Sequence, residues 1–318
     1  MRKIIVDTCG GDNPVAVIKG LSKTLKAVED VILVAVGDKA QIEEVLAGEE
    51  FDRTRLEIVA STEVITNNDH PADAIMRKRG SSMVRGYMRL KTDEDCVAMI
   101  SAGNTGALII GGVVLLGRQE GIERPALATV YPTATQKWTC LLDCGANVDC
   151  KAHHLLSFAK QGAAYMSATY KIENPKIGLL SVGTEDEKGT ALTKETFALL
   201  KESGLNFVGN IEGKTLLSGE CDVIVSDGYP GNVALKSIEG ISHAIVKIFY
   251  GLLKKNAGET SDFQFVNRAL GEFMSTYDLN SLGGAVLLGV KKQVVKAHGS
   301  ANENTVVNVV KQILRTLS

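Results

Sequence analysis

The stretch that decides the fold is Cys221 to Gly240, which reads CDVIVSDGYPGNVALKSIEG. Residues 222–225 form a short apolar run with β-branched side chains, which indicates a buried strand. Residues 226–231 contain two glycines and a proline, so we expect a tight turn there. Asn232 is a favourable N-cap, and a helix is expected from Val233 onward. A strand that passes through a glycine turn into a helix is where open α/β sheets bind ligands.

The same stretch carries polar side chains where a ligand would lie. Backbone N–H groups at a helix N-terminus favour an anion such as phosphate. Asp227, Asn232 and Lys236 add side-chain groups beside them. An ordinary loop between a strand and a helix has the same pattern, so this stretch alone leaves both interpretations open.

Length and composition narrow the class of protein. The chain has 318 residues and shows no linker or internal repeat, so we expect a single α/β domain over residues 1–318. A net charge of −2 and 5% aromatic residues argue against a nucleic-acid partner. The N-terminus lacks the apolar core of a signal peptide, and the longest apolar runs are too short to span a bilayer. These features predict a cytoplasmic protein.

One group of cysteines and histidines raises the question of a metal site. Cys140, Cys144, Cys150, His153 and His154 lie close together in the sequence. Their spacing matches no standard zinc pattern, and Cys140 lies within a predicted strand. We therefore predict buried small side chains rather than a metal site.

The periodicity of apolar residues predicts alternating strands and helices. Strands expected over 3–7, 31–36 and 56–60, with helices from Pro14 and over 39–46, imply a parallel sheet with right-handed crossovers. A helix over about 71–90, interrupted near Gly80, carries several arginines and is either a solvated face or a dock for an acidic partner. Residues 209–215 imitate a phosphate-binding loop but are one residue short between their glycines. Further strands are expected over 96–100, 128–131, 138–143, 176–182 and 293–297, and an apolar segment bounded by glycines over 283–289.

Four strand exits before the opening stretch combine glycine with polar residues. They are 10–12, 101–107, 145–147 and 183–190. Because the carboxyl ends of parallel strands meet at one edge of a sheet, these loops predict a composite site. The first of them lacks the G-x-G-x-x-G spacing of a dinucleotide site.

A protruding apolar helical pair is expected over about 233–275. Ile241, Ile245, Ile248 and Leu252 recur at helical spacing. One interpretation is a core or dimer interface, and the other is an interfacial contact with a membrane.

Together, the loops resemble those of the bacterial phosphate acyltransferase family, the acyl-acyl-carrier-protein:phosphate acyltransferases of phospholipid synthesis. The resemblance runs nearly end to end, although the family usually has a larger residue at the position of Cys9. It implies a Rossmann-like, mostly parallel α/β sheet flanked by helices, of the isocitrate/isopropylmalate dehydrogenase type, in a homodimer without a redox cofactor. The segments that carry it are GGD at 10–12, SAGNTGA at 101–107, RPA at 124–126, LDCGAN at 142–147, GTEDEKG at 183–189, SDGYPGN at 226–232 and HG at 298–299.

The resemblance implies transfer of a long-chain fatty acyl group from acyl carrier protein to inorganic phosphate. The acyl phosphate product feeds a membrane glycerol-3-phosphate acyltransferase, which implies peripheral association with the inner face of the membrane. A thioester is already activated and phosphate is already an anionic nucleophile. The protein must therefore hold two reactants together and stabilise the oxyanion that develops on the carbonyl.

Within this family we expect Ser101, Asn104 and Thr105 to bind phosphate together with Lys188. Asn232 and Lys236 are expected to orient the carbonyl or stabilise its oxyanion. His298 is expected either to protonate the leaving thiolate or to pack as a structural residue. The remaining candidates order or line the phosphate and substrate site: Gly11, Asp12, Asp143, Asn147 and Asp227.

Three other functions use the same kind of fold or the same surface features. A phosphate acetyltransferase would use a short acyl-CoA. A decarboxylating dehydrogenase would need a cluster of metal-binding aspartates, which the sequence lacks. A non-catalytic scaffold at the membrane would leave the polar strand exits unexplained.

Overall fold

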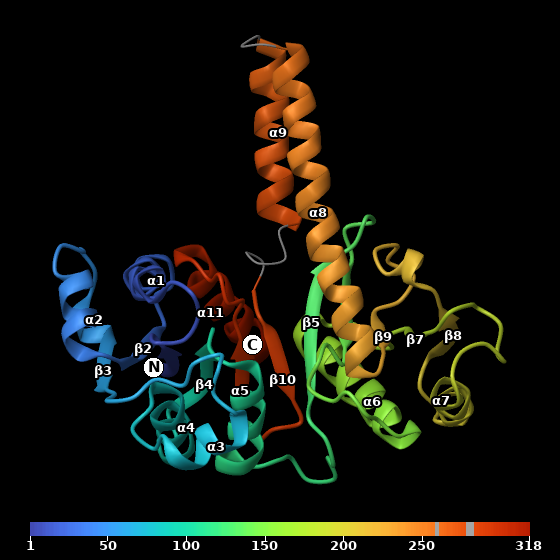
Figure 1. Cartoon of the computed structure of the whole chain (residues 1–318), viewed down its shortest axis with the longest axis horizontal. Helices are drawn as coiled ribbons and strands as arrows, with labels where there is room; N and C mark the ends of the chain where they lie inside the picture. Colours follow the sequence, from blue (N-terminus) through green and yellow to red (C-terminus); the bar gives the residue numbers. More distant parts are fainter. Residues whose placement is uncertain (258–260, 278–282) are drawn as a thin grey trace.

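The computed structural model describes residues 1–257, 261–277 and 283–318. Within them, one sheet of 11 strands has the order β3-β2-β1-β4-β11-β10-β5-β6-β9-β7-β8. Helices cover both faces of this sheet, and the hairpin of α8 and α9 projects away from it (Figure 1). The predicted class, a Rossmann-like α/β sheet flanked by helices, is confirmed.

The first half of the sheet is entirely parallel. In β1, Ile4 and Val6 face one layer of helices and Ile5 faces the other, and all three are fully buried. A strand buried on both faces reads as a continuous apolar run, as this one does. The strands of this half are β1 (Arg2–Asp7), β2 (Val31–Gly37), β3 (Leu56–Ala60), β4 (Cys96–Ser101) and β11 (Gln293–Lys296).

The second half is also parallel within itself but runs the opposite way, because β10 and β5 join the halves through antiparallel pairs. The expectation that all strand exits share one edge of a parallel sheet was therefore wrong. Strands of this half and the joint are β5 (Ala126–Pro132), β6 (Trp138–Leu142), β7 (Ile177–Leu180), β8 (Phe207–Ile211), β9 (Val223–Val225) and β10 (Ala285–Leu288).

Most helices begin and end where the sequence predicts. The predicted interruption near Gly80 is confirmed, because α3 ends at Arg77 and α4 begins at Ser82. The helices are α1 (Pro14–Ala27), α2 (Lys39–Leu46), α3 (Pro71–Arg77), α4 (Ser82–Thr92), α5 (Thr105–Gly111), α6 (Ala152–Tyr170), α7 (Ala191–Glu202), α8 (Gly228–Ala257), α9 (Ser261–Tyr277) and α11 (Glu303–Leu317).

Helix α8 begins earlier than expected. The prediction of a tight turn capped by Asn232 was wrong, since the helix already begins at Gly228. Pro230 lies in the first turn, where its missing N–H and fixed φ do no harm. Asp227 takes the capping role: its Oδ1 accepts the Tyr229 N–H at 3.0 Å.

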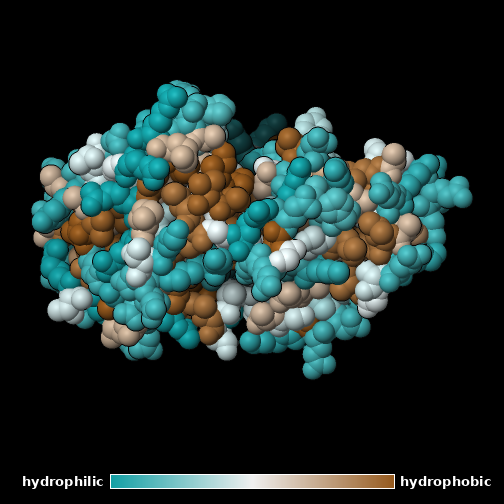
Figure 2. Space-filling view, turned by 90° about the horizontal axis from the view of Figure 1, so that it is seen from below, coloured by the Kyte–Doolittle hydropathy of each residue, from teal (hydrophilic) through white to brown (hydrophobic). Residues whose placement is uncertain are grey.

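The hairpin leaves the body after its first turns. Leu235 and Ile238 of α8 are buried against the sheet, whereas Ile241, Ile245 and Ile248 are each more than half exposed. The face of the molecule opposite the hairpin is mostly hydrophilic, with separate apolar patches (Figure 2). None of the described helices is long and apolar enough to cross a bilayer.

Candidate active site

A cavity of about 760 Å³ lies between the two halves of the sheet. Loops after β1, β4 and β11 line one side, and loops after β6 and β9 line the other. These exits belong to blocks of opposite direction. Because neighbouring strands rotate by about 20 to 25° relative to each other, twist accumulated along the sheet can turn both sets of exits toward one space. Three of the four predicted exits therefore line one cavity across the joint, whereas the exit over 183–190 contributes no residue to its lining.

Three exits of the first half touch one another through small residues. The Asp12 N–H donates to the Gly299 carbonyl at 2.8 Å. Gly11 has φ of +87°, and a Cβ there would lie 2.8 Å from the Ala102 Cβ. Only glycine suits this left-handed backbone and this close approach. The glycines thus hold the β1, β4 and β11 exits together as one wall of the cavity.

The polar side chains after β4 are mostly engaged within the protein. The Ser101 hydroxyl is fully buried and donates to Asp7 Oδ2 at 2.7 Å. Asn104 caps α5 by accepting the Ala107 N–H at 2.9 Å, and its Nδ2 donates to the Thr66 carbonyl at 3.1 Å. Ser101 and Asn104 therefore shape this loop, whereas Thr105 lines the cavity itself.

Asp143 organises the loop after β6. Its buried carboxylate accepts the N–H groups of Leu127 at 2.8 Å, Ala146 at 3.0 Å and Asn147 at 2.6 Å. The Asn147 Nδ2 donates to the same carboxylate at 2.9 Å. Burial raises the pKa of Asp143, and these donors oppose that rise.

The loop after β9 is fastened to the loop after β6. The Gly228 N–H donates to the Asn147 carbonyl at 2.8 Å. Asp227 Oδ2 accepts the Cys150 N–H at 3.0 Å, in addition to the helix cap described above. These contacts hold the start of α8 against the sheet, so that Asn232 and Lys236 line the cavity one turn apart.

A charged cluster forms the polar end of the cavity. The Lys236 Nζ lies 2.7 Å from Glu239 Oε2, and His298 Nε2 lies 4.0 Å from the same oxygen. Lys296, at the end of β11, also lines this end. Burial lowers the pKa of His298, and Lys236 lowers it further, while Glu239 opposes the shift. His298 Nδ1 accepts the Ser300 N–H at 3.2 Å, so the neutral ring carries its proton on Nε2.

The cavity is also lined by apolar and aromatic side chains, beside Lys311, Gln312 and Arg315 of α11. Leu127, Val130 and Trp138 line it together with Tyr170. The Trp138 and Tyr170 rings lie 5.4 Å apart. The Arg315 guanidinium covers them, 5.8 Å from the Trp138 ring centre and 5.4 Å from that of Tyr170. The cavity thus contains a charged cluster and an aromatic pair that a guanidinium group covers.

The structure separates the predicted site residues into three groups. Asp12, Thr105, Asn232, Lys236 and His298 line the cavity. A second group supports these loops without lining the cavity: Gly11, Ser101, Asn104, Asp143, Asn147 and Asp227. Lys188 lies outside the lining, on the exposed loop after β7, which is the strand next to β9.

Sequence reasoning missed Glu239 and Lys296. Glu239 lies one turn of helix beyond Lys236, a spacing that indicates a shared helix face. Lys296 lies near the end of the strand predicted over 293–297, two residues before His298, and was interpreted only as a residue of that strand. The strand exit itself was the available signal, because a lysine at that point can reach the site.

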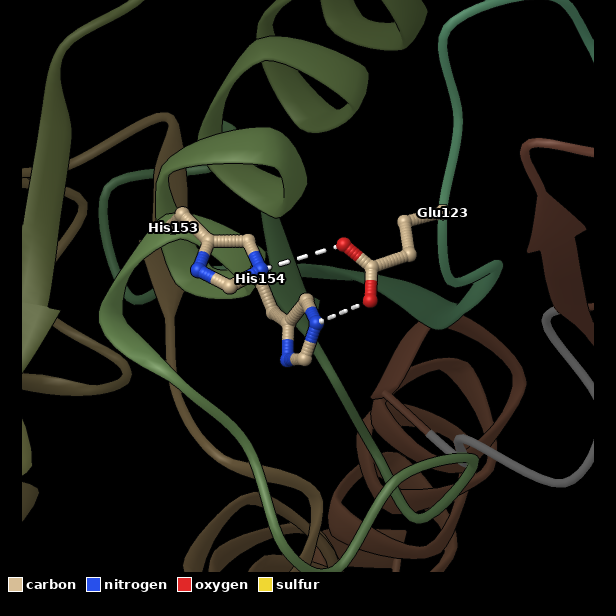
Figure 3. Close-up of side chains that lie close together, drawn as sticks. All are labelled: Glu123, His153 and His154. Carbon is tan, nitrogen blue, oxygen red and sulfur yellow. Dashed lines mark hydrogen bonds and ion pairs between the residues drawn. The ribbon is translucent and has the colours of Figure 1, made fainter.

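His153 and His154, two of the residues that raised the question of a metal site, both contact the carboxylate of Glu123. Glu123 lies 3.1 Å from His153 Nε2 through one oxygen and 3.1 Å from His154 Nε2 through the other (Figure 3). His154 Nδ1 accepts the Lys151 N–H at 3.0 Å, so its proton lies on Nε2 and points to the carboxylate side. A metal ion would need the lone pair at that position. These contacts tie the segment before β5 to the start of α6.

Comparisons with known proteins match the whole chain. The family model described as "Fatty acid synthesis protein" matches residues 2–317. The chain is 43% identical over 311 residues to a phosphate acyltransferase from Bacillus pumilus, covering 98% of this chain and 92% of that protein. It is 41% identical to a phosphate acyltransferase from Thermoanaerobacter pseudethanolicus, covering the same shares of the two chains.

Solved structures of low sequence identity share the fold. A branched-chain phosphotransacylase from Enterococcus faecalis has a TM-score of 0.64 at 14% identity, covering 100% of this chain and 99% of that one. A phosphotransacetylase from Staphylococcus aureus has a TM-score of 0.61 at 14% identity, covering 99% and 94%. The fold rests on these structures, and the family rests on the full-length matches above 40% identity: the chain belongs to the phosphate acyltransferase family.

Proposed function

We propose that the protein transfers a long-chain fatty acyl group from acyl carrier protein to inorganic phosphate, giving an acyl phosphate. The observation that carries this proposal is a single cavity that is lined by both a cluster of charged side chains and an aromatic pair. Lys236, Lys296 and His298 suit an anion, and the Trp138 and Tyr170 rings suit part of an apolar chain. The names of the relatives support the same reaction class.

The geometry supports catalysis by placement and electrostatics. A phosphate at the charged end would lie beside Thr105 and the glycine wall, within reach of the lysines. The Asn232 amide can donate to the carbonyl oxygen as negative charge develops there. Holding the thioester and the phosphate in one cavity replaces an encounter of two free reactants. No covalent intermediate with the protein is needed.

The test is phosphate-dependent release of free thiol from a long-chain acyl carrier protein, with short acyl-CoA in parallel. Release that requires phosphate and prefers the carrier protein supports the proposal. Release from short acyl-CoA alone supports a phosphate acetyltransferase instead, and no release from either supports a scaffold. Asn232→Ala tests the cavity, and Lys188→Ala tests whether the exposed loop after β7, outside the lining, still contributes to phosphate binding. Unchanged turnover in both variants would contradict both roles.

We also infer that arginines of α3, of the turn after it and of α4 help to dock acyl carrier protein, which is acidic. Arg77, Arg79 and Arg85 are exposed, whereas Arg89 is held by Glu57 at 2.8 Å and Asp93 at 2.7 Å. Arg77 lies 3.9 Å from Asp73 in an exposed pair that a partner's carboxylate can replace, whereas Arg89 is held within the protein. Helix α3 packs on α5, and Asn67 just before α3 lines the cavity. A carrier docked there would lie beside the site.

Finally, we propose that the protein works as a homodimer and contacts the inner face of the cytoplasmic membrane through its hairpin. The stripe formed by Ile241, Ile245 and Ile248 supports a covered surface, because exposed apolar stripes of this kind are typical of interfaces. An acyl phosphate with a long chain partitions toward lipid, where a membrane glycerol-3-phosphate acyltransferase would use it.

A further inference from the structure

We propose that Lys296 donates the proton that the leaving thiolate takes up. This inference rests on the proposed function and deepens it. Lys296 ends β11, and its side chain reaches into the charged end of the cavity. Lys296 thus takes the role of proton donor that was considered for His298, which lies two residues further along the chain.

The hydrogen bonds of Lys296 leave one proton for transfer. Its Nζ donates to the Ala297 carbonyl at 2.6 Å and to the Ala102 carbonyl at 3.2 Å. An ammonium group has three N–H donors, and a neutral amine keeps two. Both carbonyls therefore remain satisfied after one proton has left. The amine is held in place by the β4 exit in either protonation state.

The surroundings adjust Lys296 to this task. Burial, with a smaller contribution from Lys236 on α8, lowers its pKa to about 8, although Asp12, after β1, and Asp7, at the end of β1, oppose the shift. Glu239 on α8 and His298 are the other charged or titratable groups at this end. An ordinary thiol has a pKa of about 8.5, and general acids work best when their pKa is near that of the reacting group and the working pH.

His298 is less suited to the same step. Its pKa is lowered, so the ring is neutral at neutral pH. A neutral imidazole is far too weak an acid to protonate a thiolate, although its Nε2–H can donate a hydrogen bond to an oxyanion. We therefore assign His298 to hydrogen bonding and Lys296 to proton transfer.

An oxygen of HPO₄²⁻ forms a bond to the carbonyl carbon, and the oxyanion then expels sulfur as the C–S bond breaks. Sulfur takes a proton from Lys296 Nζ, which becomes a neutral amine. The phosphate hydroxyl gives up its proton, which restores the ammonium group directly or through water. The sum is thioester plus HPO₄²⁻ to acyl phosphate dianion plus thiol.

The experiment compares Lys296→Arg with the natural chain on a long-chain acyl carrier protein over a range of pH. Arginine keeps the positive charge but releases no proton in this range. We expect kcat/KM of Lys296→Arg to fall by at least about 100-fold, the usual size of general acid catalysis. We also expect the natural chain to lose activity as pH rises through about 8, and the variant to lose this dependence.

A second substrate separates proton donation from anion binding. A thioester of the same acyl chain with an acidic aromatic thiol needs no proton to leave, so Lys296→Arg should lose much less on it. Lys311→Met is the matched control, since Lys311 also lines the cavity and should leave the ratio between the two substrates unchanged.

Two results would overturn the proposal. One is an equal loss on both thioesters with a raised KM for phosphate, which would make Lys296 an anion-binding residue. The other is near-normal turnover and an unchanged pH profile in Lys296→Arg. If the natural chain itself releases no thiol in a phosphate-dependent way, the proposed function fails, and the role of Lys296 fails with it.

Discussion

At the scale of one residue, the lowered pKa of Lys296 reduces the free energy of unfolding at neutral pH. Its pKa is about 8 in the folded protein and about 10.5 when unfolded, so the folded state binds fewer protons between these values. Stability should therefore rise from pH 8 to 10.5 and carry the full penalty below pH 8. Relative to Lys296→Met, the natural chain should gain up to about 3 kcal/mol across this window. Urea unfolding of both proteins measures this, and a constant difference would contradict it.

Asp143 is the clearest case of a side chain that supports the site without touching substrate. Removing its carboxylate in Asp143→Ala leaves buried N–H groups of Leu127 and Asn147 without acceptors. Each such group costs about 1 to 3 kcal/mol, so for the two groups we expect a loss of about 2 to 6 kcal/mol in the free energy of unfolding, measured with urea. Asp149→Ala, at an exposed neighbour, is the control. Equal unfolding midpoints for both variants would show that the loop holds without Asp143.

At the scale of elements, the sequence predicted strands with uninterrupted apolar runs and helices with clear caps. The range 39–46 matched α2, and 56–60 matched β3. Strand β8 was missed because Gly209 and Gly213 made residues 209–215 resemble a phosphate-binding loop. The start of α8 was placed late because proline was read as a turn signal, although it is tolerated in the first helical turn.

The exposed arginines of α3 and of the turn after it lead to a prediction about the binding of acyl carrier protein. Reversing two exposed charges in Arg77→Glu with Arg79→Glu should raise KM for acyl carrier protein several-fold and weaken the dependence of KM on salt. The reason is that steering between a basic and an acidic surface is lost. Steady-state kinetics at several salt concentrations measure this. Arg53→Glu, on the short helix before β3, is the control, and an unchanged KM in the α3 variant would remove the dock.

At the scale of the whole molecule, the polar strand exits predicted a shared site, but they did not predict that the site is lined from two halves of the sheet that run in opposite directions. Local patterns report where strands end, and they carry no signal for the antiparallel joint made by β10 and β5. The charged cluster was hidden for the same reason, since Lys236 and Lys296 belong to elements far apart in the sequence. Such pairs depend on topology, which the order of elements leaves open.

The hairpin of α8 and α9 gives a prediction that concerns the whole molecule. Ile248→Glu places a charge within the exposed apolar stripe of α8. If the stripe enters the lipid headgroup region, the variant should float with anionic liposomes far less than the natural chain, because a charge at that depth is unfavourable. Val208→Glu, at an exposed position on β8, should float normally. Sedimentation tests the alternative, in which a second copy of the chain covers the stripe. A loss of dimer with Ile248→Glu would support that alternative. The membrane contact would then lie elsewhere.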